Sequence, residues 1–192
     1  HLEAVAGRVA RFDRHPALWG WYVADEPDLW DVYPAEVTRV HRAVQRAGAI
    51  KPTVVTLFQG YSAYWFKGAA DVIMVDRFPV NWMPLANFNQ HIQQARLALG
   101  GDRRLIATVQ AFDWSYFPEL LAEKPDHLRP PTHDEIRCMT YGALAAGANG
   151  LFYGAYEDGG WRMWEHPETW EALGRVVGEV RGRLPLFAAE RR

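Results

Sequence analysis

The sequence contains a single cysteine, Cys138, among its 192 residues. A disulfide needs two cysteines, so no internal disulfide framework stabilises the fold. Long apolar runs are also missing, because none reaches the roughly 18 residues that a membrane-spanning helix needs. The first residues lack the apolar stretch of a signal peptide. We therefore expect no membrane partner, and the sequence leaves the cellular compartment open.

Charge gives no sign of a nucleic-acid partner. Lysine and arginine together number 21 and aspartate and glutamate 23, which is a formal net charge of −2 at pH 7. No basic stripe of the kind that binds phosphate backbones is present. The seven histidines lack the spacing of metal ligands, and no glycine-rich phosphate loop follows an apolar run. We therefore expect neither a metal nor a cofactor.

Aromatic residues are the one class in excess. The chain has nine Trp, eight Tyr and nine Phe, many of them in segments that read as loops. Aromatic rings in loops often stack on sugar rings, but tryptophan also fills partly buried surfaces. Composition alone does not decide between these two roles.

The stretch LWGWYVADEP, residues 18–27, predicts a short buried strand that ends on two carboxylates. Its bulky residues show no polar alternation, which is typical of a strand covered on both faces in a parallel sheet. Asp25 and Glu26 follow at once, and Pro27 cannot donate to a continuing ladder. Acids at the carboxyl end of a buried strand are how α/β barrels build active sites.

Helices and strands alternate along the whole chain. The predicted helices are residues 2–12, 34–47, 85–99, 132–146 and 168–184. The predicted strands are residues 18–24, 53–57, 71–76, 105–110 and 150–153. One helix start has the pattern of a capping box, with Thr132 followed three residues later by Glu135. Strict alternation predicts one α/β domain over residues 1–192, with a parallel sheet and right-handed crossovers.

Five strands are too few for a closed eight-stranded barrel, which typically needs about 250 residues. One remaining architecture is an open doubly wound sheet, although no phosphate loop supports it. The other is a partial (β/α)8 TIM barrel.

Three segments favour the partial barrel by resemblance. Residues 15–27, HPALWGWYVADEP, resemble the fourth-strand motif of TIM-barrel glycoside hydrolases of the β-galactosidase and cellulase type, a strand ending in Asn-Glu-Pro or Asp-Glu-Pro. Residues 72–79, VIMVDRFP, look like their sixth strand, and residues 137–153 like their seventh helix and eighth strand. The resemblance implies the C-terminal portion of such a barrel, from about its fourth to its eighth strand, with an oligosaccharide or polysaccharide as the carbohydrate that is cleaved or bound.

The same resemblance assigns roles to individual residues. Glu26 matches the catalytic acid/base, and Asp25 replaces the asparagine that touches the sugar 2-hydroxyl in the family. A retaining enzyme would carry a nucleophilic Glu at the end of the seventh strand, where this chain has Gln110. An amide cannot act as a glycosyl nucleophile. Either another acid serves, or the reaction is inverting or absent.

The second carboxylate remains open between two positions. Glycoside hydrolysis needs two carboxyls, roughly 5 Å apart for retention or 6.5–9.5 Å for inversion, one of them with a raised pKa. Repulsion between the adjacent Asp25 and Glu26 favours such a raised value. We rank Asp76 first and Glu157 second as partners of Glu26; a pair of Asp25 with Asp76 would suit an α-galactosidase-like plan. Each also has a possible structural role instead of a catalytic one. Asp76 would form an ion pair with Arg77, and Glu157 would belong to a glycine-containing turn.

Six further residues are candidates for substrate binding. They are Gln110, Trp65, Trp82, Trp114, Tyr153 and Trp161. Most of the tryptophans lie in loops after predicted strand ends, where we expect one or two to stack on sugars. Gln110 either contacts ligand or is a structural amide bonded to backbone.

Two other functional classes stay open. One is a non-catalytic carbohydrate-binding or structural half-barrel that lacks the seventh-strand nucleophile. The other is an open-sheet enzyme whose Asp25, Glu26 and Asp76 hold Mg²⁺. A five-stranded piece of a barrel, whether catalytic or not, leaves two sheet edges exposed. We therefore expect a partner: another copy of the chain, or a missing N-terminal barrel segment.

Overall fold

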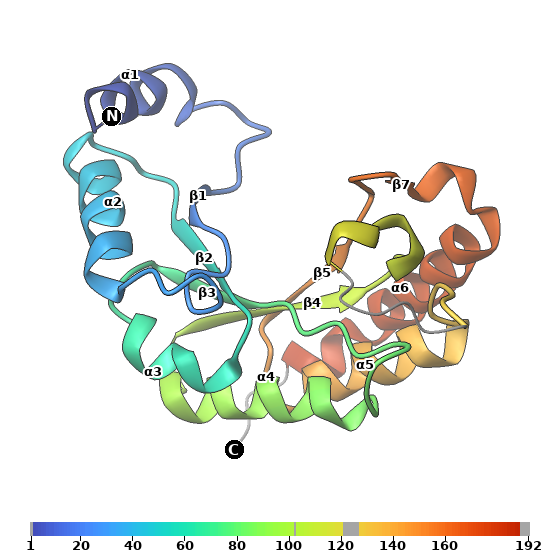
Figure 1. Cartoon of the computed structure of the whole chain (residues 1–192). Helices are drawn as coiled ribbons and strands as arrows, with labels where there is room; N and C mark the ends of the chain where they lie inside the picture. Colours follow the sequence, from blue (N-terminus) through green and yellow to red (C-terminus); the bar gives the residue numbers. More distant parts are fainter. Residues whose placement is uncertain (1, 102, 121–126, 189–192) are drawn as a thin grey trace.

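The structure is a computed structural model that describes residues 2–101, 103–120 and 127–188. Its main feature is one parallel sheet of five strands in the order β1-β2-β3-β4-β5 (Figure 1). The strands are β1 (Trp21–Ala24), β2 (Thr53–Leu57), β3 (Val72–Val75), β4 (Arg104–Gln110) and β5 (Gly150–Gly154). Within the described residues β1 and β5 are the two edges, so the sheet does not close into a barrel. The predicted α/β class, parallel pairing and number of strands are confirmed.

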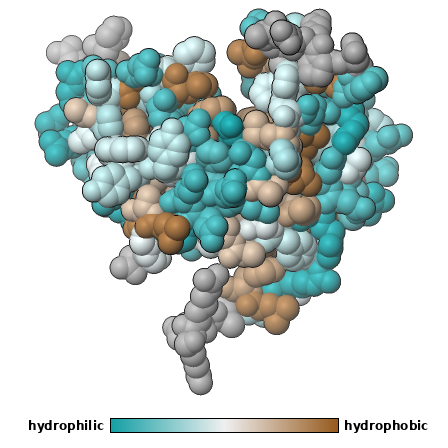
Figure 2. Space-filling model, turned by 60° about the horizontal axis from the view of Figure 1, so that its bottom comes forward, coloured by the Kyte–Doolittle hydropathy of each residue, from teal (hydrophilic) through white to brown (hydrophobic). Residues whose placement is uncertain are grey.

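In the described part of the chain, six α-helices accompany the sheet. They are α1 (Leu2–Phe12), α2 (Pro34–Arg46), α3 (Ala63–Phe66), α4 (Ala86–Leu99), α5 (His133–Ala145) and α6 (Pro167–Ala188). Helices α2 to α6 follow one another around one face of the sheet, the outer face (Figure 1). Seen from below, this side is mostly hydrophilic with small apolar patches (Figure 2). None of the described helices is both long and apolar enough to span a membrane.

Most boundaries agree with the predicted ones to within one residue, and three differences are larger. β1 begins at Trp21 rather than at residue 18, because residues 18–20 have no regular structure and the first ladder bond is from the Trp21 N–H to Pro52 O, just before β2. α6 continues through Pro185 to Ala188 instead of stopping before the proline. The segment after β2, predicted as a loop, contains a 3₁₀ turn (Gly60–Ser62) and α3.

The strands contribute two unequal parts of the core, because successive strand residues point to opposite faces; a further cluster contains Phe112, Phe117 and Trp161. On the outer face Val55, Leu57, Ile73 and Val75 are at most 1% exposed and pack with residues of the covering helices. On the opposite, inner face, a small cluster contains Val54, Val72 and Ile106.

The sheet is strongly curled. Trp19, just before β1, packs edge to face on Phe152 of β5 with 5.9 Å between ring centroids. Because β1 and β5 are the two edge strands, this contact shows that the edges approach each other on the inner face. The curl matches the curvature of a partial barrel.

The capping box at the start of α5 is confirmed. The Thr132 side chain accepts from the Glu135 N–H, and the Glu135 carboxylate accepts from the Thr132 N–H at 2.8 Å. Arg129 binds the same carboxylate with two nitrogens, at 2.6 and 2.9 Å. This ion pair lowers the pKa of Glu135 to about 2.

The capping box gives a stability prediction. Thr132→Ala leaves a helix N–H without its acceptor, so the free energy of unfolding falls by about 1 kcal/mol in urea denaturation. The control is Thr38→Ala, because the Thr38 hydroxyl only bonds back to Pro34 O inside α2 and its loss is nearly neutral. Equal effects of the two substitutions would contradict the assignment of the cap.

Candidate functional site

A β-bulge lies at the end of β1, immediately before the two predicted acids. Tyr22 pairs with Val54, but Ala24, two residues on, pairs with Val55, the very next residue of β2. The extra residue bends the strand and redirects the chain that follows. The Glu26 N–H then donates to Thr56 O at 3.0 Å. This bond fixes the acidic segment against the carboxyl end of β2.

The backbone of Glu26 is strained. Its φ is 41°, in the left-handed region that residues with a side chain rarely adopt. Such conformations cost on the order of 1–3 kcal/mol and gather at functional sites, where the surrounding structure enforces them. Here the bond to Thr56 O and the buried Pro27 hold the segment in place.

Asp76 follows β3 and meets Glu26 across the end of β2. The two carboxyl groups lie within hydrogen-bonding reach of each other. One oxygen of Asp76, Oδ1, is buried and has no other hydrogen-bond partner among the described residues. Two carboxyls in this arrangement cannot both ionise without strong repulsion, so they share a proton. The first-ranked predicted pair is therefore brought together.

Both members of the pair have raised pKa values. Burial, followed by the nearby charge of Asp25, raises the pKa of Glu26 to about 7. Burial and the charge of Glu26 raise the pKa of Asp76 well above its usual range. A carboxyl that keeps its proton near neutral pH is able to act as a general acid.

Asp25 is held by a hydrogen-bonded chain of two hydroxyls. The Tyr22 hydroxyl donates to Asp25 Oδ1 at 2.5 Å and lies 2.6 Å from the hydroxyl of Thr56. Because Tyr22 gives its only proton to the carboxylate, Thr56 is left to donate to Tyr22. Burial, the first cause, and this bond to Asp25 raise the pKa of Tyr22 well above its usual value. The arrangement keeps the charge of Asp25 beside Glu26.

Two more residues complete the surroundings. The Asp28 carboxylate accepts from the backbone N–H groups of Phe58 and Gln59, at 3.0 and 2.8 Å. Arg77 stacks over the Phe58 ring at 4.2 Å and donates from Nε to Asn87 Oδ1 at 3.0 Å. Arg77 thus bonds to Asn87, not to Asp76, and its charge favours ionisation of Glu26.

Three of the predicted binding residues serve in packing. Gln110 is fully buried; its Oε1 accepts from the Val80 N–H and its Nε2 donates to Phe112 O, so it is the structural amide of the two alternatives. Tyr153 places its hydroxyl 3.2 Å from that of Thr140 in α5. Trp161 is fully buried and donates to Ala155 O at 3.0 Å, which leaves no ring surface for a sugar.

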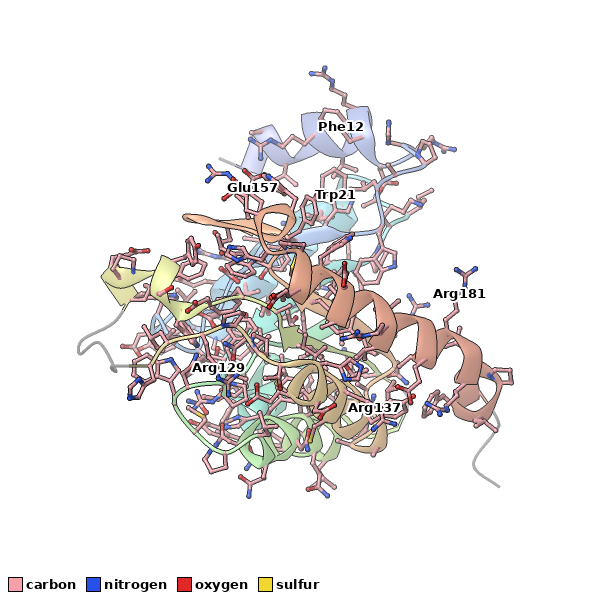
Figure 3. The ribbon with its side chains drawn as sticks, turned by 90° about the vertical axis from the view of Figure 1, so that its right-hand side faces the viewer. Phe12, Trp21, Arg129, Arg137, Glu157 and Arg181 are labelled. Carbon is pink, nitrogen blue, oxygen red and sulfur yellow. The ribbon has the colours of Figure 1, made fainter. Side chains whose placement is uncertain are left out.

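Trp65, Trp82 and Glu157 are exposed. Trp114 is half-buried, with its ring edge to face against Phe112 and Phe117. Trp65 and Trp82 are 59% and 40% exposed, and Trp82 packs edge to face on Trp114. Glu157 lies in the hairpin of β6 (Glu157–Asp158) and β7 (Trp161–Arg162), ahead of α6 (Figure 3). Its carboxylate is 3.9 Å from Arg162 Nε. The structure therefore pairs Glu157 with an arginine of its own hairpin.

Sequence reasoning missed Tyr22, Thr56 and Asp28. The signal for Asp28 was its place directly after Asp-Glu-Pro, and for Tyr22 its place three residues before Asp25. The bulge hid the second signal, because simple alternation misplaces side chains beyond a bulge. For the magnesium alternative, the described residues include no group of three or more His, Cys, Asp or Glu side chains arranged to hold a metal ion.

Comparison with known proteins shows which solved structures share the fold of this chain. No family model matches the sequence, and no curated protein matches it. Among solved structures, a protein assigned as an α-L-fucosidase of Bacteroides thetaiotaomicron matches with a TM-score of 0.60, at 10% identity, over 93% of this chain and 58% of that one. The chain has a glycoside hydrolase-like fold.

Two further structures agree with this result. A β-D-glucuronidase of Dictyoglomus thermophilum has a TM-score of 0.54 at 17% identity, over 81% of this chain and 28% of its own. A β-glucuronidase of an uncultured Clostridium has a TM-score of 0.53 at 12% identity, over 81% and 29%. This chain spans only part of each of these proteins, and identities this low show a common fold alone.

The acid pair gives a prediction about stability and pH. Its pKa values are raised in the folded chain, so folding takes up protons and stability falls as pH rises from about 4 through 7. The neutral side chain in Glu26→Gln does not ionise. The variant therefore comes closest to the parent in free energy of unfolding at about pH 4 and gains on it by pH 8, measured by urea denaturation.

The control for this measurement is Glu171→Gln, which changes an exposed carboxylate on α6. Its stability difference from the parent should be the same at both pH values. If Glu26→Gln behaves like this control, the raised pKa of Glu26 is wrong.

Proposed function

We propose that this chain carries a glycoside hydrolase site in which Glu26 is the general acid/base and Asp76 the second carboxylate. The single observation behind the proposal is the close pair of carboxyls, Glu26 and Asp76, at the carboxyl ends of β1 and β3, both with raised pKa values. Glycosidases use two carboxyls around one bond, one of them protonated at working pH. The substrate is a carbohydrate.

In this mechanism Glu26 gives its proton to the glycosidic oxygen as the bond to the sugar breaks. Asp76, the more deeply placed group, then acts as the carboxylate that stabilises the sugar cation, attacks it or activates water. A sugar must enter between the two groups, which requires a separation of about 5 Å or more. Because the backbone of Glu26 is held by Thr56 O, the part-exposed side chain of Glu26 is the group that turns aside to admit the sugar.

Asp25 modulates the pair rather than reacting itself. Its charge is the second cause, after burial, of the raised pKa of Glu26. The bond from Tyr22 keeps that charge in place. Asp25 thereby helps Glu26 to hold its proton until a sugar arrives.

We also propose that the five strands correspond to the fourth to eighth strands of a (β/α)8 barrel. The sequential strand order, the curl of the sheet and the two unpaired edges support this. The edges then pair with further strands, from another copy of the chain or from a preceding segment.

Gln110 favours a second candidate, a site that binds carbohydrate without cleaving it. The position that corresponds to the seventh-strand acid holds an amide bonded at both ends to backbone. If Asp76 does not take over the role of that acid, binding remains and turnover is lost.

The test is hydrolysis of a panel of 4-methylumbelliferyl glycosides by the 192-residue chain. We expect turnover of at least one glycoside, and a loss of 10²-fold or more in kcat for Glu26→Gln, the range expected when a general acid is removed. Because the acid must be protonated, kcat falls as pH rises above about 7. Glu171→Gln is the matched control and keeps the parent rate.

Binding without hydrolysis of any glycoside would support the second candidate. Hydrolysis that survives Glu26→Gln would contradict the assigned role of Glu26.

A further inference from the structure

Three neighbouring aromatic side chains form an exposed group beside the acid pair. Tyr61, Tyr64 and Trp65, here called the aromatic ridge, are 50%, 58% and 59% exposed. The Trp65 ring lies edge to face with both tyrosines, at 6.1 and 5.8 Å between centroids. The same short segment buries Ala63 and Phe66 in the core. Core packing therefore accounts for those two residues and leaves the ridge outside.

The backbone beneath the aromatic ridge is fixed. The Gly60 N–H donates to Nδ1 of the buried His91 in α4, at 2.9 Å. A Cβ on Gly60 would lie 1.9 Å from the His91 carbonyl oxygen, so only glycine permits this close approach. The rings are thus presented on a rigid support, which lowers the entropy cost of binding a ligand.

Two contacts join the aromatic ridge to the acid pair. Asp28, two residues after Glu26, accepts from the N–H groups of Phe58 and Gln59, which begin the segment that carries the ridge. Arg77, adjacent to Asp76, stacks on Phe58 and interacts electrostatically with both Glu26 and Tyr61. The ridge therefore adjoins the acid pair at the carboxyl-terminal edge of the sheet.

We propose that the aromatic ridge binds sugar rings of a glycan chain whose scissile bond lies at the acid pair. The preferred substrate is then an oligosaccharide or polysaccharide, and an aryl glycoside is cleaved without the contacts that the ridge supplies. Sugar rings have an apolar C–H face that packs on an aromatic ring and hydroxyls that reach polar tips such as those of Tyr61 and Tyr64. The inference rests on the proposed function for the position of the cleaved bond.

The experiment is affinity electrophoresis in gels that contain hydroxyethyl cellulose, xylan or galactan. All proteins carry Glu26→Gln, so that hydrolysis does not alter the polymer. We expect at least one polymer to retard the chain, and Trp65→Ala to weaken that retardation at least tenfold in apparent Kd. Trp65→Phe keeps an aromatic face and retains most of the binding.

The matched control is Trp170→Ala, which removes a tryptophan that is 52% exposed on α6. It binds like the parent. The inference is overturned if none of the three polymers retards the chain, or if Trp65→Ala binds as the parent does. Circular dichroism and urea denaturation check that each variant is folded, and Trp65→Phe keeps the test valid should the alanine variant unfold.

The outcomes also separate the two proposals. Trp65-dependent binding of a polymer by a chain that hydrolyses no glycan supports the aromatic ridge and removes the proposed hydrolysis. Hydrolysis of aryl glycosides without binding of any of the three polymers supports the proposed hydrolysis and overturns the proposed role of the aromatic ridge.

Discussion

The site depends on one constraint, the placing of two carboxyl groups in a position where only one can readily ionise. Parallel strands bring their carboxyl ends to the same edge of a sheet, so Glu26 after β1 and Asp76 after β3 meet across the end of β2. Burial and mutual repulsion then keep a proton on the pair. The bulge in β1 and the left-handed backbone of Glu26 are local adjustments that serve this meeting.

The surroundings offset the cost of such a site. Thr56 and Tyr22 fix Asp25, Asp28 ties the acidic segment to the chain after β2, and Arg77 places a positive charge nearby. These partners come from three strand ends, so the site is a property of the sheet edge and not of one loop. The same contacts fix the position of the aromatic ridge relative to the acids, which relates the proposed chemistry to the proposed substrate class.

The sequence was sufficient for the fold and for the acid pair. Alternating apolar segments predicted the five parallel strands, and strand ends predicted Glu26 with Asp76. It was insufficient where tertiary packing decides: Trp161 lies in a segment that reads as a loop but is fully buried, and Gln110 bonds only to backbone. The bulge that brings Tyr22 to Asp25 has no signature in one strand alone, because it is defined by pairing with β2.

The measurement that tests the shared proton most directly is a carbon-13 NMR titration of the side-chain carboxyl carbons of Glu26 and Asp76. The account predicts that Glu26 titrates near pH 7, that Asp76 titrates well above the usual aspartate range, and that each resonance responds to the ionisation of the other group. Independent titration of both carboxyls below about pH 5, as in exposed side chains, would contradict it.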